Sequence, residues 1–241
     1  MDASTLERLV PDDIRDETAT GLETLKLHLE RYDFAAAAAN GPRVLDMACG
    51  VGYGSARIAE LRPDVSSVTG VDLSAEAIAY ATRRYSGPRT RFLNADAMTY
   101  SDGAPYDTIV SLETIEHLPD PRGYARRLPQ LLAPDGVLVA SVPITPSVDG
   151  NPHHLHDFSE RSFLKMMVEA GFAPEKTFYQ DQPFSPFAVA FKTDKRMADA
   201  RPSLAAFYLR RPDKLLLRLK ATLVHGFKNR YATVVFRKAA A

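Results

Sequence analysis

Short apolar runs alternate with amphipathic stretches along most of the chain, and this alternation predicts strands separated by helices. Strands that are connected by helices form a parallel sheet with helices on both of its faces. We expect strands at residues 43–47, 67–71, 91–94, 106–112 and 137–142, and helices at 55–61, after Ser74, and at 123–132.

The two flanks of this core extend the pattern. Apolar residues three and four positions apart predict a helix over 21–39, which ends at Gly41-Pro42. Further elements are a helix at 158–170, with Phe163, Leu164, Met167 and Val168 buried, and strands at 173–179 and 230–237. The sequence thus predicts one α/β domain over 1–241, with an N-terminal helical cap (1–40), a core (41–179), an insertion (180–228) and a last strand (229–241).

The composition narrows the class of protein. The chain has 241 residues, of which 45% are apolar and 25% charged, as in ordinary globular domains. Its 30 basic and 30 acidic residues balance, so no overall charge favours nucleic acid as a partner. The single cysteine, Cys49, excludes an internal disulfide, and no apolar run reaches the roughly 18 residues of a membrane span. The first residues are polar, unlike a signal peptide, so we expect a cytoplasmic protein.

The balanced total hides a basic segment. Residues 192–228 contain ten Lys or Arg and only three Asp. Within it, leucines and cations are interspersed over 210–224, which suits a lid helix on a substrate cleft or a helix on an anionic membrane surface. The same segment is also a candidate contact in a homodimer. These three interpretations stay open at the level of sequence.

A glycine-rich turn follows the first predicted strand. Asp46 precedes Gly50, Gly52 and Gly54 in the spacing G-x-G-x-G, and the second strand ends in Asp72. Glycines allow a ligand to approach the backbone, and a carboxylate at the second strand can accept hydrogen bonds from both ribose hydroxyls. An acidic residue just before the turn suits a cationic ligand better than a pyrophosphate. The alternatives are a dinucleotide-dependent dehydrogenase and a purely structural turn.

The segment D-x-A-C-G-x-G-Y-G resembles motif I of the class I S-adenosylmethionine (SAM)-dependent methyltransferases. SAM carries a sulfonium and an ammonium group and no phosphate. The resemblance implies a Rossmann-like, seven-stranded methyltransferase sheet with helices on both faces and a helical insertion before the last strand. It also implies that Asp96 reads the adenine amino group, although a helix-capping role is the alternative, and that Tyr32 closes over the cofactor. The expected SAM-binding residues are Asp46, Ala48, Gly50, Gly52, Tyr53, Asp72, Leu73, Asp96, Ala97, Leu112 and Tyr32.

The segment E-x-x-E-H-L at 113–118 resembles the branch of this family that methylates small molecules. The chain lacks the Asn-Pro-Pro-Tyr sequence typical of enzymes that methylate DNA bases, which argues against a nucleobase as the methyl acceptor. His117 is expected just past the end of a strand, where ligands of open α/β sheets bind. It is a candidate to orient the substrate, and a loop-bracing role is the alternative.

Three histidines and an aspartate cluster in N-P-H-H-L-H-D at 151–157, again after a strand. Transfer of a methyl group to a hydroxyl requires loss of the proton, and a histidine with its usual pKa of about 6.5 suits that task. Similar enzymes carry N-P-x-H here, which makes His154 the expected base or substrate anchor. Asp157 is the expected orienting partner of a histidine, and His156 is a further catalytic candidate. We assign no metal; the alternatives are a divalent metal held by His154, His156 and Asp157, and a structural turn.

These motifs together predict a SAM-dependent O-methyltransferase that acts on a small-molecule hydroxyl. E-R-L-x-P at 7–11 and H-L-x-R-Y at 28–32 resemble enzymes of bacterial surface-glycan and sugar pathways, so a sugar or glycan intermediate is the expected acceptor. The basic segment suits an acceptor linked to phosphate or to a lipid diphosphate, with Arg210 and Arg211 as its contacts. The alternatives are a secondary metabolite or quinone-type phenol as acceptor, a non-catalytic SAM-fold subunit that binds a partner protein, and a nicotinamide oxidoreductase, which the glycine spacing disfavours.

Overall fold

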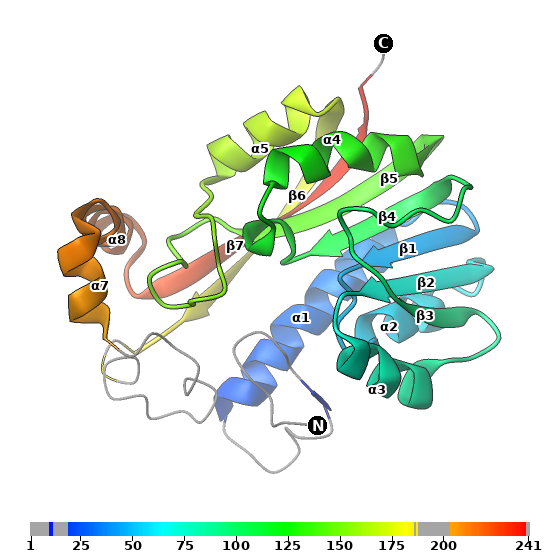
Figure 1. Cartoon of the computed structure of the whole chain (residues 1–241), viewed down its shortest axis with the longest axis horizontal. Coiled ribbons are helices and arrows are strands. Elements are labelled where there is room, and N and C mark those ends of the chain that lie inside the picture. Colours follow the sequence, from blue (N-terminus) through cyan, green and yellow to red (C-terminus); the bar gives the residue numbers. More distant parts are fainter. Residues whose placement is uncertain (1–9, 12–18, 186, 188–202, 240–241) are drawn as a thin grey trace.

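The computed structural model describes residues 10–11, 19–185, 187 and 203–239 of the chain. These residues build one seven-stranded sheet in the order β3-β2-β1-β4-β5-β7-β6 (Figure 1). The strands β1 to β5 run parallel, whereas β7 is antiparallel to both β5 and β6. The strands are β1 (Arg43–Met47), β2 (Ser67–Asp72), β3 (Thr90–Asn94), β4 (Tyr106–Leu112), β5 (Leu132–Pro143), β6 (Phe172–Pro183) and β7 (Lys228–Lys238).

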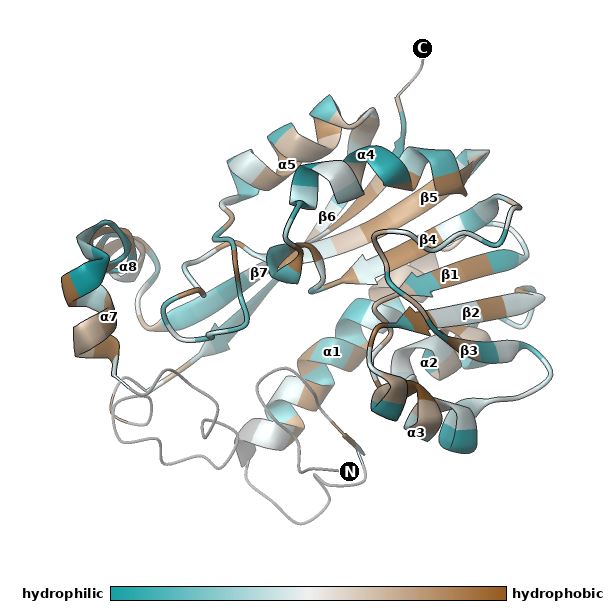
Figure 2. Cartoon of the chain, in the orientation of Figure 1, coloured by the Kyte–Doolittle hydropathy of each residue, from teal (hydrophilic) through white to brown (hydrophobic). Residues whose placement is uncertain are grey.

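Helices cover both faces of this sheet, as the alternating pattern predicts. One face carries α4 and α5, and the other carries α1, α2 and α3 (Figure 1). Tyr124 of α4 and Phe163 of α5 are completely buried in the core of the first layer, and Ile58 of α2 in that of the second. The central strands β1, β4 and β5 are mostly apolar (Figure 2), which matches their burial on both faces, whereas the edge strands β3 and β6 are largely exposed. The helices are α1 (Ala19–Ala38), α2 (Tyr53–Leu61), α3 (Ala75–Tyr85), α4 (Pro121–Leu131) and α5 (Glu160–Glu169), and a 3-10 turn, η2, spans Ile115–His117.

Side chains at the helix starts fix where the helices begin. The Oγ of Ser74 accepts a hydrogen bond from the Ala77 N–H at the start of α3, as predicted. Asp120 caps α4 in the same way, and Ser159 forms a reciprocal capping box with Ser162 at the start of α5.

The fold confirms the predicted sheet, with three local differences. Residues 134–136, expected to separate α4 from β5, belong to β5, because the strand already begins at Leu132, which pairs with Tyr106. On α5, Met166 is buried while Val168 is 53% exposed, so the expected burial of Val168 is wrong. Pairing of β6 with β7 continues to Pro183 and Lys228, so the segment between these strands is shorter than the predicted 180–228.

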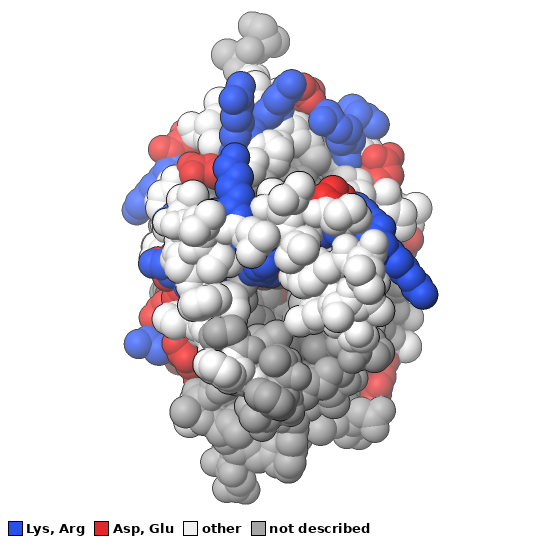
Figure 3. Space-filling view, turned by 90° about the vertical axis from the view of Figure 1, so that its left-hand side faces the viewer, with Lys and Arg blue, Asp and Glu red and all other residues white. Residues whose placement is uncertain are grey.

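Two helices project beyond the far ends of β6 and β7, α7 (Leu204–Arg210) and α8 (Pro212–His225) (Figure 1). Where described residues form this end of the molecule, uncharged side chains occupy the middle of the view, with Lys and Arg above them and to both sides (Figure 3). Within the described part of the chain, no helix combines the length and the apolar character needed to cross a bilayer. The exposed apolar side chains of α7 and α8 include Leu209, Leu216, Leu219, Leu223 and Val224.

Candidate cofactor and acceptor site

A cavity of about 1020 Å³ opens at the carboxyl ends of the parallel strands. Its walls combine α1, the glycine turn, the ends of β2 and β4, and the turns that carry His117 and His153. Most of the residues expected to bind SAM line it. From the sequence-predicted set, the lining contains Tyr32, Ala48, Gly50, Tyr53, Asp72, Leu73, Asp96, Ala97, Leu112 and His117.

The glycine turn is held by the carboxylate of Asp72. One carboxylate oxygen accepts from the Gly50 N–H at 2.9 Å and the other from the Ser74 N–H at 2.8 Å. The turn uses left-handed backbone, with φ values of 61° at Ala48, 55° at Gly50 and 86° at Gly52. A Cβ added at Gly50 would meet no atom within 4 Å, so the turn presents an open backbone edge. Asp72 therefore shapes the turn in addition to its predicted ribose contact.

Asp46 lies beneath the turn and is not among the residues that line the cavity, contrary to the expected direct contact with SAM. Its side chain is 1% exposed, and it accepts hydrogen bonds from Ser55 Oγ at 2.6 Å and Tyr32 Oη at 3.4 Å. Burial raises the pKa of Asp46 to about 7. The carboxylate joins β1, α2 and α1, and a cation bound nearby would favour its ionised form. Gly52 also lies outside the lining: a Cβ there would be 2.6 Å from Ala81 Cβ.

Tyr32 packs directly on the helix that follows the turn. Its ring occupies the space where a Cβ at Gly54 would stand, so the third glycine of the motif is required by this contact. Tyr32 is 8% exposed and meets Tyr53 edge-to-face, with 6.0 Å between ring centroids. The structure thus places Tyr32 on the cavity wall, where the resemblance predicts it.

We expect Gly54→Ala to destabilise the protein by about 1–3 kcal/mol, because the new methyl group forces Tyr32 out of its position. Chemical denaturation measures the loss. Gly87→Ala is the matched control, since its Cβ would meet only Thr90 Oγ1 at 3.5 Å. Equal stabilities of the two variants would show that Tyr32 moves at no cost.

Asp96 lies at the opposite wall, after β3. Its side chain is exposed, and Oδ1 accepts from the Met98 N–H at 2.8 Å. The Asp96 carbonyl also accepts from the Thr99 and Tyr100 N–H groups, which closes a tight turn. Asp96 thus closes a turn and caps no helix, since β4 is the next element after β3. Its position on the cavity wall is compatible with the adenine contact.

Two histidines meet where His117 lines the cavity, and His154 lies behind that wall. The rings of His117 and His154 pack edge-to-face with 4.6 Å between centroids. His154 Nδ1 lies 2.7 Å from Ser147 Oγ, and His117 Nδ1 lies 3.3 Å from the His153 carbonyl. Burial, with a smaller effect of the neighbouring His117, lowers the pKa of His154 to about 3. His154 is therefore a neutral imidazole and a weak proton acceptor, which argues against its expected role as general base.

Comparison with known proteins agrees with this geometry. Residues 22–177 match the family model described as a methyltransferase domain, which covers the glycine turn, Asp72, Asp96 and both histidine turns. The chain belongs to the class I SAM-dependent methyltransferases. SAM is thus the cofactor of its family, and the dehydrogenase alternative is excluded.

The relatives of this methyltransferase match its core. An uncharacterized methyltransferase from Mycobacterium tuberculosis is 36% identical over 113 residues, 46% of this chain and 56% of the relative. Trans-aconitate 2-methyltransferase from Streptomyces avermitilis is 41% identical over 108 residues, 42% of this chain and 39% of the relative. The matches thus span about half or less of these relatives. N-methyltransferase NodS from Bradyrhizobium japonicum, solved with S-adenosyl-L-homocysteine, shares the fold with a TM-score of 0.58 at 16% identity, covering 96% of this chain and 94% of its own.

Two of the expected catalytic residues brace the methyltransferase's loops instead. Asp157 accepts from the N–H groups of Ser147 and Val148 at 2.8 and 3.0 Å, and from Lys214 Nζ at 2.6 Å. His156 Nε2 donates to the Leu118 carbonyl at 3.0 Å. The alternative metal set of His154, His156 and Asp157 is therefore not assembled. Ser147, which the sequence did not single out, is the hydrogen-bond partner of His154 and takes the orienting role that was expected of Asp157 toward a histidine.

Arg31 is a buried cation on the cavity wall that the sequence motifs did not indicate. Arg31 of α1 is 3% exposed and lies over the ring of Tyr231, 4.3 Å from its centroid. It donates to Gln180 at 2.7 Å and lies 3.7 Å from Glu113 Oε1. Glu113 has a left-handed φ of 48° and accepts from Ser141 Oγ at 2.7 Å. This charged pair brings a guanidinium and a carboxylate to the cavity, at the end of β4.

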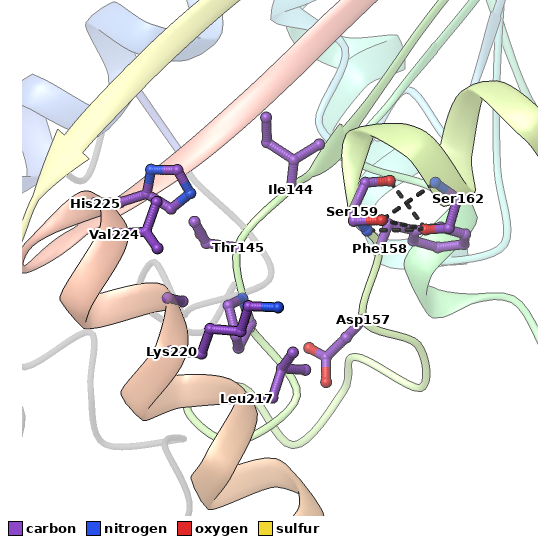
Figure 4. A pocket seen from close by; sticks show the side chains of 12 residues that line it. Ile144, Thr145, Asp157, Phe158, Ser159, Ser162, Leu217, Lys220, Val224 and His225 are labelled. Atoms are coloured by element: carbon purple, nitrogen blue, oxygen red, sulfur yellow. Dashed lines mark hydrogen bonds between the residues drawn. The ribbon is translucent and has the colours of Figure 1, made fainter.

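A second hollow of about 390 Å³ separates α8 from the loop after β5 (Figure 4). Lys220 and His225 come from α8, whereas Ser159 and Ser162 come from the start of α5. Cations that the sequence offered for phosphate binding are engaged around it: Lys214 binds Asp157, and Arg218 binds Asp149 with both distances at 2.6 Å. These two ion pairs thus connect α8 to the loop after β5 that carries His154.

Proposed function

We propose that this methyltransferase transfers a methyl group from SAM to a hydroxyl oxygen of a small molecule, a sugar or glycan intermediate. The observation that carries the proposal is one cavity of about 1020 Å³, whose lining includes the glycine turn, Asp72 and His117. Ligand pockets for single small molecules have about 300–1,000 Å³, so this volume accommodates a cofactor and an acceptor side by side. The open backbone edge at Gly50 is compatible with close approach of the cofactor.

Bound SAM would supply an electrophilic methyl group on its sulfonium. The residues of the chain then act mainly by positioning: Asp72 and the turn hold the nucleoside end, and the far wall holds the acceptor in line with the methyl group. Alignment of this kind can supply about 7–11 kcal/mol of the barrier. As the new C–O bond forms and the C–S bond breaks, the hydroxyl proton must leave. His117 is the histidine of the predicted set that lines the cavity, so we assign it to that end of the acceptor.

The anchor for an anionic acceptor differs from the expected one. Arg210 ends α7 and Arg211 lies between α7 and α8; both are exposed and outside the cavity lining. Arg211 pairs with Asp213 at 2.8 Å. Arg31 is the buried cation that does line the cavity. We therefore place a phosphate or carboxylate of the acceptor at Arg31. A contact between the acceptor and α8 is supported only by the positive charge of that helix.

The test is formation of S-adenosylhomocysteine by the purified chain with a panel of acceptors: free sugars, nucleotide-linked sugars, phenols and amines. We expect turnover with a hydroxyl acceptor and an O-methyl signal in the NMR spectrum of the product. A phenolic product would support the secondary-metabolite alternative. A methylated amine would replace the proposed acceptor class, and binding of S-adenosylhomocysteine without turnover on any acceptor would favour a non-catalytic subunit.

The exposed leucines of α7 and α8 support two proposals for a partner. One is contact with a membrane surface, and the other is contact with a second copy of the chain. Leu216 and Leu223 are 68% and 87% exposed, and Lys220 beside them is also exposed. Cosedimentation with anionic vesicles supports the first, and a dimer in analytical ultracentrifugation that dissociates in Leu223→Glu supports the second.

A further inference from the structure

We propose that Glu116, His117 and His154 form a binding site for a divalent first-row transition-metal ion at the acceptor end of the cavity. One ligand atom from each of these side chains lies within 4.8 Å of the other two. The three residues come from two separate turns, η2 after β4 and the histidine turn after β5. His117 also lines the cavity, so an ion at this place would be next to the proposed acceptor.

Backbone hydrogen bonds hold the two turns in register. The carbonyl of Glu116 accepts from the Leu155 N–H at 2.8 Å and from the His156 N–H at 3.2 Å. His156 adds its side-chain bond to the Leu118 carbonyl. The two halves of the candidate site are therefore connected directly on both sides of its ligands. A site of this kind needs little rearrangement to accept an ion.

The outer contacts of both imidazoles suit metal ligands, which usually bond a protein group through their second nitrogen. His117 Nδ1 lies against the carbonyl of His153, so Nδ1 carries the proton and Nε2 carries the lone pair. His154 is oriented in the same way through Nδ1, by Ser147 Oγ. Asp157 in turn fixes Ser147 by accepting its N–H. The candidate site thus consists of the ligand side chains and a second layer of groups that orients the two imidazoles.

The charge and chemistry of the group select the type of ion. Glu116 is 0% exposed, and burial of a carboxylate is costly unless a positive charge lies near it. Two imidazoles and one carboxylate suit Zn²⁺, Mn²⁺, Fe²⁺ or Co²⁺, whereas Ca²⁺ and Mg²⁺ prefer all-oxygen sets.

The use of the ion rests on the proposed function. An acceptor hydroxyl bound to the metal would lose its proton to solvent more easily. The oxygen lone pair would then form the C–O bond while the electrons of the C–S bond return to sulfur. No oxidation or reduction takes place in this sequence. The metal would thereby supply the activation of the acceptor hydroxyl.

The test uses the full chain, stripped of metal with a chelator and dialysed. Titration with Co²⁺, followed by its visible absorption, and calorimetric titration with Mn²⁺ and Zn²⁺ should show one equivalent bound per chain. Glu116→Gln and His154→Gln should each weaken binding at least 100-fold. His225→Gln, a histidine outside the site, should bind like the wild type. Absence of stoichiometric binding, or equal binding by all three variants, would overturn the site.

Two further measurements separate this proposal from the proposed function. Calorimetry with S-adenosylhomocysteine on Glu116→Gln should show binding close to that of the wild type, which demonstrates that the variant is folded. Acceptor turnover should fall on chelation and return with the added metal. Turnover that is indifferent to the metal would overturn its catalytic use even if the ion binds. A chain that binds metal and no S-adenosylhomocysteine would contradict the methyltransferase proposal and leave the site intact.

Discussion

Asp72→Ala is expected to weaken the binding of S-adenosylhomocysteine by at least about 100-fold. The change removes the predicted ribose acceptor, and it also removes the carboxylate that holds the Gly50 and Ser74 N–H groups. Hydrogen bonds to a charged group are each worth about 1.5–3 kcal/mol. Loss of the two predicted ribose hydrogen bonds therefore exceeds the roughly 2.8 kcal/mol that corresponds to a factor of 100. Isothermal titration calorimetry on both proteins measures the difference.

Two variants make this result specific. Glu76→Ala removes a neighbouring carboxylate from the first turn of α3, outside the cavity lining, and should leave the affinity unchanged. Asp72→Asn keeps the shape and one acceptor oxygen, so it should bind more strongly than Asp72→Ala. An affinity of Asp72→Ala within threefold of the wild type would mean that the nucleoside does not lie along this wall.

The cofactor half of the site could be predicted from the sequence because its parts are close together in the chain. Gly50 and Asp72 are the ends of consecutive elements of one βαβ unit, and parallel pairing of β1 with β2 brings them together. The spacing of residues in the sequence is enough to predict such an arrangement. It does not show whether a side chain is buried or reaches the cavity. Asp46 was therefore expected in the cavity, whereas it lies beneath the turn and joins Ser55 to Tyr32.

The acceptor half depended on contacts that spacing does not encode. Arg31 meets Gln180, 149 positions later, only because β6 lies next to β7 and α1 packs across the sheet. In the histidine turn, the direction of each side chain follows from backbone bonds to η2 rather than from the number of residues between them. Asp157 therefore faces α8, and His154 faces His117, although Asp157 was expected to orient one of the histidines.

Arg218→Met is expected to release α7 and α8 from the body of the protein. Arg218 donates Nε and Nη2 to the two oxygens of Asp149, both at 2.6 Å, and Tyr208 of α7 donates to the same carboxylate at 2.6 Å. Removal of one partner of a buried pair costs about 3–5 kcal/mol. We expect the lower limit, about 3 kcal/mol, because Asp149 is only 3% exposed but Arg218 keeps 19% exposure.

Hydrogen–deuterium exchange over 204–225 is the direct measurement, because the loss should be local before it is global. Protection of α8 should fall in Arg218→Met and in Asp149→Asn, and the double variant should lose little more than either alone. Arg211→Met is the matched control: its ion pair with Asp213 is exposed on both sides, so its loss should leave stability close to that of the wild type. Equal exchange in Arg218→Met and Arg211→Met would show that this pair does not anchor α8.

The same pair predicts a pH dependence. Burial alone would raise the pKa of Asp149, but the hydrogen bonds and charge of Arg218 prevail and hold it below its ordinary value. A depressed carboxyl pKa contributes stability above the unfolded-state pKa of about 3.9, and that stability is lost as the pH falls through the folded-state value. Protection of α8 should therefore decrease toward acidic pH in the wild type and stay low in Asp149→Asn. Since the anchored loop also carries His154, release of α8 should reduce the affinity for the acceptor while binding of S-adenosylhomocysteine persists.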